Sequence, residues 1–171
     1  MADPMPGSAP LRNEIFAGNR AVGRIAFTVA AGLGGSRRGR VHESGSLRVR
    51  FPNGNSLAAL DAVIVNTGGG MTGGDRFDID IKVGAGARLS VTTAAAEKIY
   101  RSLGPDTDIY VKLDVGAGGA LAWLPQETIV FDQARLRRSI DIELARDAKL
   151  LLAEAAEIGR ASCRERVCLA V

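Results

Sequence analysis

A glycine-rich run is the part of the chain whose residue types and spacing come closest to a chemical motif. Residues 66–75 read NTGGGMTGGD and contain the spacing G-x-G-x-x-G of a dinucleotide-binding turn. That turn functions only if a helix follows it, because the helix N-terminus binds the pyrophosphate. Residues 76–83 instead alternate apolar and polar side chains, which predicts a strand. Glycines used for tight bends are therefore the favoured interpretation, and a nucleotide-binding enzyme that uses the loop from Gly68 to Gly74 is the alternative.

Imidazole and thiolate groups, which serve most often as nucleophiles, bases and metal ligands, are scarce. His42 is the only histidine, and both cysteines, Cys163 and Cys168, lie near the end of the chain. His42 lies in a polar, loop-like stretch, so no Ser-His-Asp or Cys-His arrangement is expected around it. Metal sites built from imidazole or thiolate ligands need clusters of such residues, which one histidine does not provide. Two cysteines in a chain of this length also exclude a scaffold held together by disulfides. The sequence predicts a protein that is not an enzyme.

Carboxylates and other polar groups are plentiful, but most of them are expected on the solvent faces of strands. Two concentrations of polar residues stand apart from that pattern. Glu97, Lys98, Tyr100 and Arg101 lie close together, and Glu127 follows a Pro-Gln pair at the end of an expected strand. Either group suits a buried polar network or an interface, and the residue types favour neither.

The elements that must position these groups are strands, and their pattern repeats. Residues 77–83 alternate apolar and charged side chains and end in Gly-Ala-Gly. The pattern returns about 32 residues later at 109–115, and a third copy at 140–144 follows after about 29 more. A second apolar segment follows each copy, so each unit is interpreted as a hairpin of two strands and a tight turn. One hairpin cannot bury its apolar face alone, so stacked copies must share a core.

The rest of the chain adds further strands and little helix. Strands are expected at 23–30, 45–51 and 57–65, with a turn at 52–55 and a flexible connection at 31–40. Only residues 93–101 (TAAAEKIYR) have the alanine content of a short helix. The predicted fold class is mainly β: a layered or β-helical, solenoid-like stack of strand pairs with one or two short helices. A closed barrel is the alternative.

Composition narrows the class of protein further. The chain has 171 residues, is 46% hydrophobic and carries a formal net charge of +3, which is typical of a single globular domain. We expect a β-rich domain at 21–156 after a flexible segment at 1–20. There is neither an apolar run of about 18 residues nor a signal peptide, so we expect a cytoplasmic protein that does not contact a membrane. The basic clusters 37–40 and 135–138 are expected to be solvated, because 5% aromatic residues is too few for a nucleic-acid reader.

The end of the chain departs from the strand pattern. Residues 157–171 have neither strand nor helix periodicity, and the string EIGRASCRERV resembles a translated sequencing adapter. We therefore expect the native sequence to stop near Ala156 and residues 157–171 to be a non-native tail. An irregular native tail with a Gly-Arg turn is the alternative.

Two blocks of the sequence resemble the UreD family of urease accessory proteins, also called UreH. The matching pieces are NTGGG from Asn66, GGDR from Gly73, TTAAA from Thr92, KIYRS from Lys98, WLPQETIVFD from Trp123 and ARLRR from Ala134. Their order and spacing agree with the family over roughly residues 20–156. Combined blocks of this kind are far more specific than a glycine run alone.

The resemblance implies a cytoplasmic scaffold, or chaperone, that helps to assemble the nickel centre of urease. Members of the family bind the partner UreF, and through it the GTPase UreG, on the urease apoprotein. GTP hydrolysis belongs to UreG, and nickel is thought to pass through an internal water-filled channel. The resemblance also implies a β-rich helical stack of strands. Family members continue beyond this end, so the chain is expected to be truncated at its C-terminus.

The residue types favour weak handling of nickel. Without a cysteine before Cys163, contacts with Ni²⁺ must come mainly from carboxylates, carbonyls and water, which hold nickel more loosely than imidazole or thiolate. We expect no tightly bound cofactor, only transient Ni²⁺ passage, with a dissociation constant no tighter than micromolar, about −8 kcal/mol. A plain structural solenoid without a metal is a further alternative. Candidate channel or interface residues, chosen by their place in the motifs, are Asp75, Arg76, Glu97, Lys98, Tyr100, Arg101 and Glu127.

Overall fold

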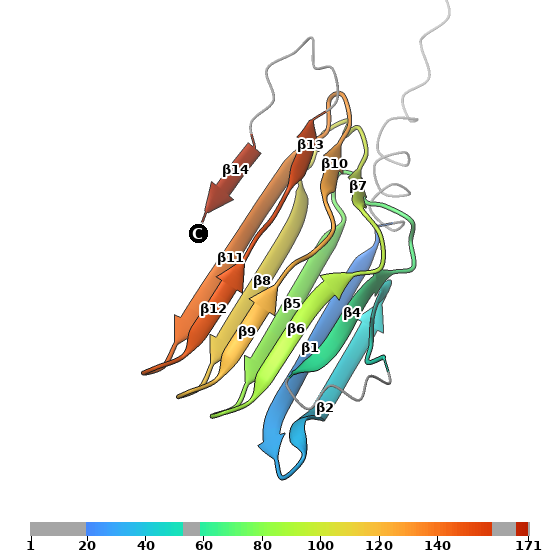
Figure 1. The fold of residues 1–171 in the computed structure, drawn as a ribbon. Helices are drawn as coiled ribbons and strands as arrows, with labels where there is room; N and C mark the ends of the chain where they lie inside the picture. The colour runs from blue at the N-terminus through green and yellow to red at the C-terminus, as the bar shows by residue number, and fades with distance from the viewer. Residues whose placement is uncertain (1–19, 53–58, 159–166, 171) are drawn as a thin grey trace, which may run out of the picture.

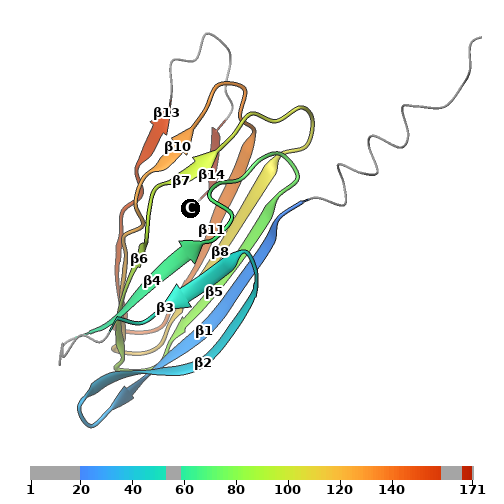
Figure 2. The same cartoon turned by 90° about the vertical axis from the view of Figure 1, so that its right-hand side faces the viewer.

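The computed structural model describes residues 20–52, 59–158 and 167–170, and every regular element in these ranges is a β-strand. The strands form three sheets, two long and one short (Figures 1 and 2). The first sheet has the order β14-β11-β8-β5-β1-β2, the second β12-β9-β6-β4-β3, and the third β13-β10-β7. The strand bounds are β1 Val22–Gly32, β2 Gly35–Gly45, β3 Leu47–Arg50, β4 Leu60–Asn66, β5 Arg76–Val83, β6 Arg88–Thr93, β7 Glu97–Ile99, β8 Thr107–Val115, β9 Ala120–Trp123, β10 Thr128–Val130, β11 Leu136–Leu144, β12 Lys149–Leu152, β13 Ala156–Ile158 and β14 Val167–Ala170.

Three successive rungs make up the body of the molecule. Each rung contributes one strand to each sheet: β5, β6 and β7 form the first, β8, β9 and β10 the second, and β11, β12 and β13 the third. Equivalent strands pair in parallel and in register, so that Val83 lies beside Val115 and Val115 beside Leu144. This confirms the solenoid-like stack and the repeat found in the sequence. The strands divide among three separately ordered sheets, so the barrel alternative is wrong.

The two long strands of a rung do not form the expected hairpin. β5 pairs with β1 and β8, whereas β6 pairs with β4 and β9, so the Gly-Ala-Gly segment is an arch between two sheets. Gly86 and Gly118 have φ of 67° and 65° at equivalent places of two arches, as glycine permits. The third arch has Asp147 there, with φ of 60°; among non-glycine residues, aspartate is one that adopts this conformation most readily. The alternation of the sequence predicted strands correctly but does not specify their partners.

The apolar faces of the two long sheets meet in one core. In β8 every second residue is buried, from Ile109 through Leu113 to Val115, while the residues between them are partly exposed. Trp123 of β9 is the largest fully buried side chain. Burying side chains of this size stabilises the fold by about 1.5–3 kcal/mol each, which no single rung can achieve alone.

Antiparallel strands close one end of the stack. β1 and β2 form a hairpin whose strands meet at the pair Gly32 and Gly35, and β3 pairs antiparallel with β4. The expectation of a flexible connection at 31–40 is therefore wrong, because most of those residues belong to the hairpin strands. His42, expected in a loop, is an exposed residue of β2. The arginines at 37–40 are exposed as expected, whereas Arg138 of the second basic cluster is only 9% exposed.

The expected helix at 93–101 is the clearest correction. Thr93 ends β6, residues 94–96 bend, and Glu97–Ile99 forms β7. β7 pairs in parallel with β10, and Met71 forms a bridge with Ile99 on its other side. Pairing on both edges outweighs the weak helical propensity of three alanines. The described ranges contain no helix, hence none long and apolar enough to cross a membrane.

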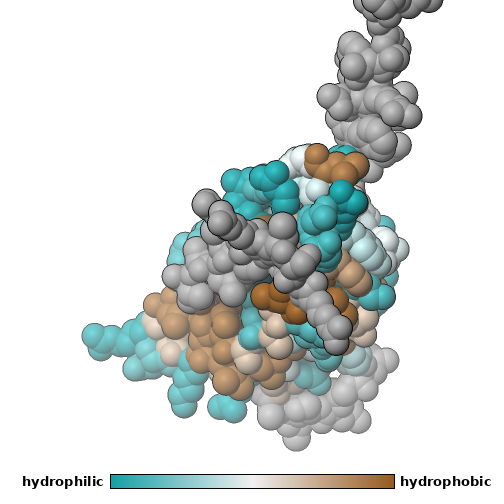
Figure 3. All heavy atoms as spheres, turned by 90° about the horizontal axis from the view of Figure 1, so that it is seen from above, coloured by the Kyte–Doolittle hydropathy of each residue, from teal (hydrophilic) through white to brown (hydrophobic). Residues whose placement is uncertain are grey.

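The other end of the stack leaves apolar side chains exposed. Leu144 of the third rung is 49% exposed, although Val83 and Val115, which occupy its place in the first two rungs, are buried. Leu151 of β12 is also exposed, but it lies on the outward face of the strand, between Leu150 and Leu152, which pack against the core. In Figure 3, brown apolar surface gathers on the side where β11 and β12 lie. No further rung covers that side among the described residues.

Some expectations concern residues outside the described ranges. The flexible segment at 1–20 falls almost wholly there, as does most of the turn at 52–55. Within 157–171 the structure describes only the end of β13 and the strand β14, which pairs in parallel with β11. The domain boundary near Ala156 and the non-native tail stay predictions.

Candidate functional site

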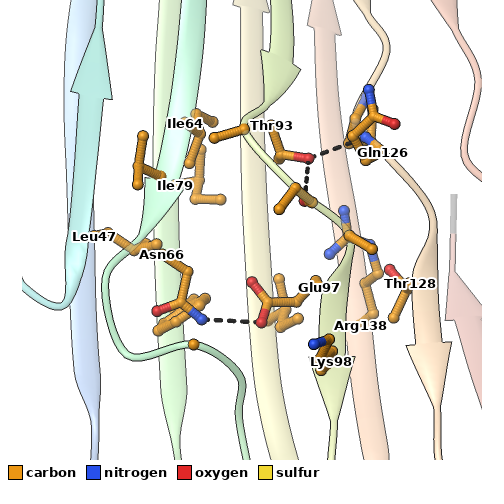
Figure 4. Close-up of a pocket in the computed structure, with 18 of the residues that line it drawn as sticks. Leu47, Ile64, Asn66, Ile79, Thr93, Glu97, Lys98, Gln126, Thr128 and Arg138 are labelled. Atoms are coloured by element: carbon orange, nitrogen blue, oxygen red, sulfur yellow. Dashed lines mark hydrogen bonds between the residues drawn. The ribbon is translucent and has the colours of Figure 1, made fainter.

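A cavity of about 270 Å³ lies between the two long sheets, next to the third sheet (Figure 4). That volume holds several water molecules and is smaller than a typical site for a drug-sized ligand. Its apolar wall is formed by inward residues of the long sheets, including Leu47, Ile64, Phe77, Ile79, Ile109 and Trp123. Its polar lining consists of Asn66, Thr93, Glu97, Lys98, Gln126, Thr128 and Arg138.

Glu97 points into the cavity because of its place in β7. Ile99, two residues further along the strand, is completely buried, so Glu97 shares the inward face. The amide Nδ2 of Asn66, the last residue of β4, donates a hydrogen bond of 2.9 Å to Glu97 Oε1 (Figure 4). Nearby, the backbone N–H of Gln126 donates to Thr93 Oγ1 at 3.0 Å. These bonds join the ends of strands from different sheets.

A second polar cluster borders the cavity around Glu154. Arg138 faces inward from β11 and donates from Nε to Glu154 Oε2 at 2.9 Å; its Nη2 pairs with Glu154 Oε1. The indole N–H of the buried Trp123 donates to Glu154 Oε1 at 2.8 Å. The guanidinium of Arg138 is thus held by a carboxylate from the segment after β12. Because Glu154 compensates its charge, Arg138 can remain almost completely buried.

The pKa values of the two carboxylates, Glu97 and Glu154, shift in opposite directions. Burial raises the pKa of Glu97, and the hydrogen bond from Asn66, the backbone N–H of Lys98 and the charge of Arg138 offset this only in part. Burial would also raise the pKa of Glu154, but the bonds and charge of Arg138 and the bond from Trp123 outweigh it and lower that pKa.

The arrangement suits loose contact with a cation more than tight coordination. Glu97 presents its carboxylate at the cavity, which Thr93 and Thr128 also line, whereas the amide oxygen of Asn66 accepts from the Gly68 N–H at 2.8 Å. Among the described residues, no three His, Cys, Asp or Glu side chains lie close enough together to hold a metal ion. One carboxylate with neutral oxygens provides fewer and harder ligands than a resident nickel site requires.

Of the residues predicted from sequence, Glu97 and Lys98 line the cavity. Asp75 is 6% exposed and fixes the end of the glycine-rich loop by hydrogen bonds. Its Oδ2 accepts from the Thr72 N–H and its Oδ1 from the Ala21 N–H, both at 2.8 Å. Arg76 lies on the outer face of the first sheet, paired with Asp78 at 2.8 Å. Asp75 and Arg76 therefore do not join the cavity.

The remaining predicted residues gather around the third sheet. Lys98, Tyr100 and Arg101 are exposed beside β7, on the side away from the core. Glu127 contributes its backbone carbonyl, which accepts from the Glu97 N–H at 3.0 Å. The strand divides the residues at 97–101 into the inward carboxylate of Glu97 and an exposed outward group, and a functional role for them stays a prediction.

Sequence reasoning missed Asn66, Trp123, Arg138 and Glu154 as members of the cavity border. A signal for Arg138 was available: it alternates with Leu136 and Ile140, so it is a charged residue on the apolar face of a strand. The pairing of Glu154 with Arg138 carried no such signal, because it depends on the path of the chain after β12.

The glycine-rich run has a structural use. β5 begins at Arg76, so no helix follows the loop from Gly68 to Gly74. A Cβ on Gly70 would come within 2.4 Å of the Tyr100 ring, and one on Gly73 within 2.0 Å of Ser102 Oγ. The glycines let the loop pack against residues 98–105, and no observation supports the alternative of nucleotide binding.

Fold and cavity together define a class: a solenoid of β-strands with a small, mainly apolar cavity between its sheets that a few polar side chains line. A family model described as UreD urease accessory protein matches residues 20–169. The urease accessory protein UreD of Rhodopseudomonas palustris strain HaA2 is 60% identical over 153 residues, which cover 90% of this chain and 54% of that protein. The UreD of strain BisB5 is 57% identical over 158 residues, covering 92% of this chain and 56% of that protein. The UreD of Bradyrhizobium diazoefficiens is 51% identical over 163 residues, covering 95% of this chain and 59% of that protein.

The chain therefore belongs to the UreD family of urease accessory proteins, as the sequence blocks had indicated. It spans about half the length of the curated relatives that it matches.

Proposed function

We propose that this chain serves urease maturation as a scaffold component that acts with UreF and UreG on the urease apoprotein. In the cytoplasm it would help to incorporate nickel into the urease active site, without catalysing a reaction itself. Membership of the UreD family supports the role in maturation. The observation that carries the nickel part is the cavity between the sheets, with the single inward carboxylate of Glu97.

The chemistry of the cavity favours passage of a cation over its storage. Ni²⁺ that meets the carboxylate of Glu97 keeps most of its water ligands, so it can leave as readily as it enters. Arg138 lines the same cavity, but its charge is compensated by Glu154. Lys98 also lines the cavity, so the negative charge of Glu97 is partly offset and the attraction for a divalent ion is weak.

Complementation of a urease operon without its own UreD gene tests the maturation role. A full-length version of this protein is expected to restore urease activity and the nickel content of the purified enzyme. Glu97→Gln is expected to slow activation when nickel is limiting, because it removes the inward charge. Glu143→Gln, the same substitution on the exposed outer face, serves as the matched control.

The outcomes separate the two parts of the proposal. If the folded full-length protein leaves urease inactive and free of nickel, the maturation role is wrong. If Glu97→Gln activates urease as fast as Glu143→Gln at limiting nickel, the cavity has no part in handling the ion. Titration calorimetry provides a further check: stoichiometric binding of nickel in the nanomolar range would contradict the expected limit at micromolar affinity.

A further inference from the structure

The outer side of the third sheet carries an exposed pair of aromatic rings. Ile99 and Val130 are buried, so the residues that follow them, Tyr100 and Phe131, point away from the core. Their rings stack with centroids 5.2 Å apart and an interplanar angle of 20°. Tyr100 is 42% and Phe131 40% exposed. Large aromatic side chains left partly exposed in this way are typical centres of protein interfaces.

Hydrogen bonds hold the backbone around Tyr100 in place, and the neighbouring glycines carry no side chains that would cover it. The Tyr100 N–H donates to the Met71 carbonyl and the Met71 N–H to the Lys98 carbonyl, both at 2.7 Å. These bonds hold the glycine run beside β7, and Gly70 leaves the space that the Tyr100 ring occupies. Gly69 has nothing within 4 Å of its Cβ position. The surface beside the rings is therefore preorganised, which lowers the entropic cost of binding.

Two cations flank the rings on the β7 side. Lys98 and Arg101 are exposed, and neither takes part in an ion pair within the described part of the chain. Exposed Arg135 and Arg137, by contrast, pair with Asp106 and Asp108. A partner with carboxylates around an apolar side chain complements this surface in charge and in hydropathy.

Stacking on nucleobases is the competing use of aromatic and basic residues together. Here the two rings lie against each other, so each has one face occupied by its neighbour. Asp132, in the turn after β10, and Glu157 of β13 are also exposed, and both repel phosphate. The geometry favours a protein partner.

We infer that the stacked pair of Tyr100 and Phe131, with Lys98 and Arg101 at its edge, docks a partner protein through an apolar side chain flanked by carboxylates. This inference rests on the proposed function, because the partner is taken to be another component of urease maturation. It adds the location of the interface and the chemistry of the surface that meets it.

Binding of purified UreF to the full-length protein, measured by calorimetry, tests the inference. Tyr100→Ala combined with Phe131→Ala is expected to weaken binding tenfold or more, as loss of an interface centre does. Lys98→Glu with Arg101→Glu, two exposed positions that leave the core intact, is expected to weaken it as well. Arg37→Glu with Arg40→Glu on β2 is the matched charge control and is expected to bind like the wild type.

Each result has a separate meaning. If the wild type does not bind UreF, the partner in the proposed function is wrong. If the wild type binds and both variant pairs on the third sheet bind equally well, the assigned surface is wrong. An equal loss for the control on β2 would show general charge attraction and would overturn the inference. Binding of poly-dT that requires Tyr100 and Phe131, without binding of UreF, would assign the surface to nucleic acid instead.

Discussion

The side-chain amide of Asn66 donates a 2.9 Å hydrogen bond to the carboxylate of Glu97, a residue 31 positions later in the chain. This bond links the end of a strand in one long sheet to the start of a strand in the short sheet. It stabilises the ionised form of a carboxylate that burial disfavours. Because burial is the larger effect, the pKa of Glu97 is raised despite this hydrogen bond.

The raised pKa of Glu97 predicts how its contribution to stability depends on pH. A group whose pKa is higher in the folded state stabilises the fold below its ordinary pKa, and this contribution is lost as pH rises through the raised value. Glu97→Gln should therefore remove part of the stabilisation seen on going from neutral pH to about pH 4. Urea denaturation at both pH values measures this difference. An unchanged difference in the variant would show that Glu97 titrates normally.

The ion pair of Arg138 with Glu154 predicts the opposite dependence. The lowered pKa of Glu154 provides stability above its ordinary pKa, and this is lost as pH falls through the lowered value. Glu154→Gln should reduce that acid-dependent loss.

Removing Arg138 tests the same pair directly. Arg138→Met should destabilise the fold by about 1–3 kcal/mol, since it leaves Glu154 without its charge partner. The loss of unfolding free energy in the double variant, Arg138→Met with Glu154→Gln, should be smaller than the sum of the losses in the two single variants. A double-mutant cycle measured by urea denaturation gives the difference. Additive effects would contradict a direct coupling.

Gly70 is expected to tolerate no side chain. Gly70→Ala would place a Cβ 2.4 Å from the Tyr100 ring, at a φ of 152°. We expect a loss of about 1–3 kcal/mol and a displaced Tyr100 ring, seen as a change in near-ultraviolet circular dichroism. Gly69→Ala is the matched control, because it also has a positive φ but meets open space. Equal spectra for the two variants would argue against contact between Gly70 and Tyr100.

The arches predict a difference between Gly116 and Ala145, which occupy equivalent places in successive rungs. A Cβ on Gly116 would lie 2.8 Å from the backbone nitrogen of Ala85 in the preceding arch. Gly116→Ala should therefore cost about 1–3 kcal/mol, whereas Ala145→Gly should cost less than about 1 kcal/mol. Midpoints of urea unfolding compare the two. The arches would be less closely stacked than described if Gly116→Ala proved neutral.

Local pattern accounts for what the sequence predicted well. The alternation in 77–83 and 109–115 gave strand type, burial and period, because side-chain direction in a strand depends only on position along it. The same pattern could not distinguish a hairpin from an arch, since the pairing partner is chosen by the sheet. At 93–101 the alanines indicated a helix, and the neighbouring strands on both edges overrode that weak preference.

The lining of the cavity was predictable in part, because the direction of a side chain follows from its position along a strand. Glu97 stood out as a polar residue in a motif, and its inward direction follows from strand geometry. The contact of Arg138 with Glu154 joins residues 16 positions apart through the third arch and β12. No periodicity records such a contact, because it arises from the route of the chain in three dimensions.

The antiparallel hairpin at one end of the stack gives the molecule a direction. β2 occupies the edge beside β1, so the parallel ladder of the first sheet cannot lengthen there. Each later rung finds its template in the rung completed before it, in the order in which a ribosome delivers the strands. Folding can thus proceed while the chain is being synthesised, and an error in one rung is passed to every rung that is added after it.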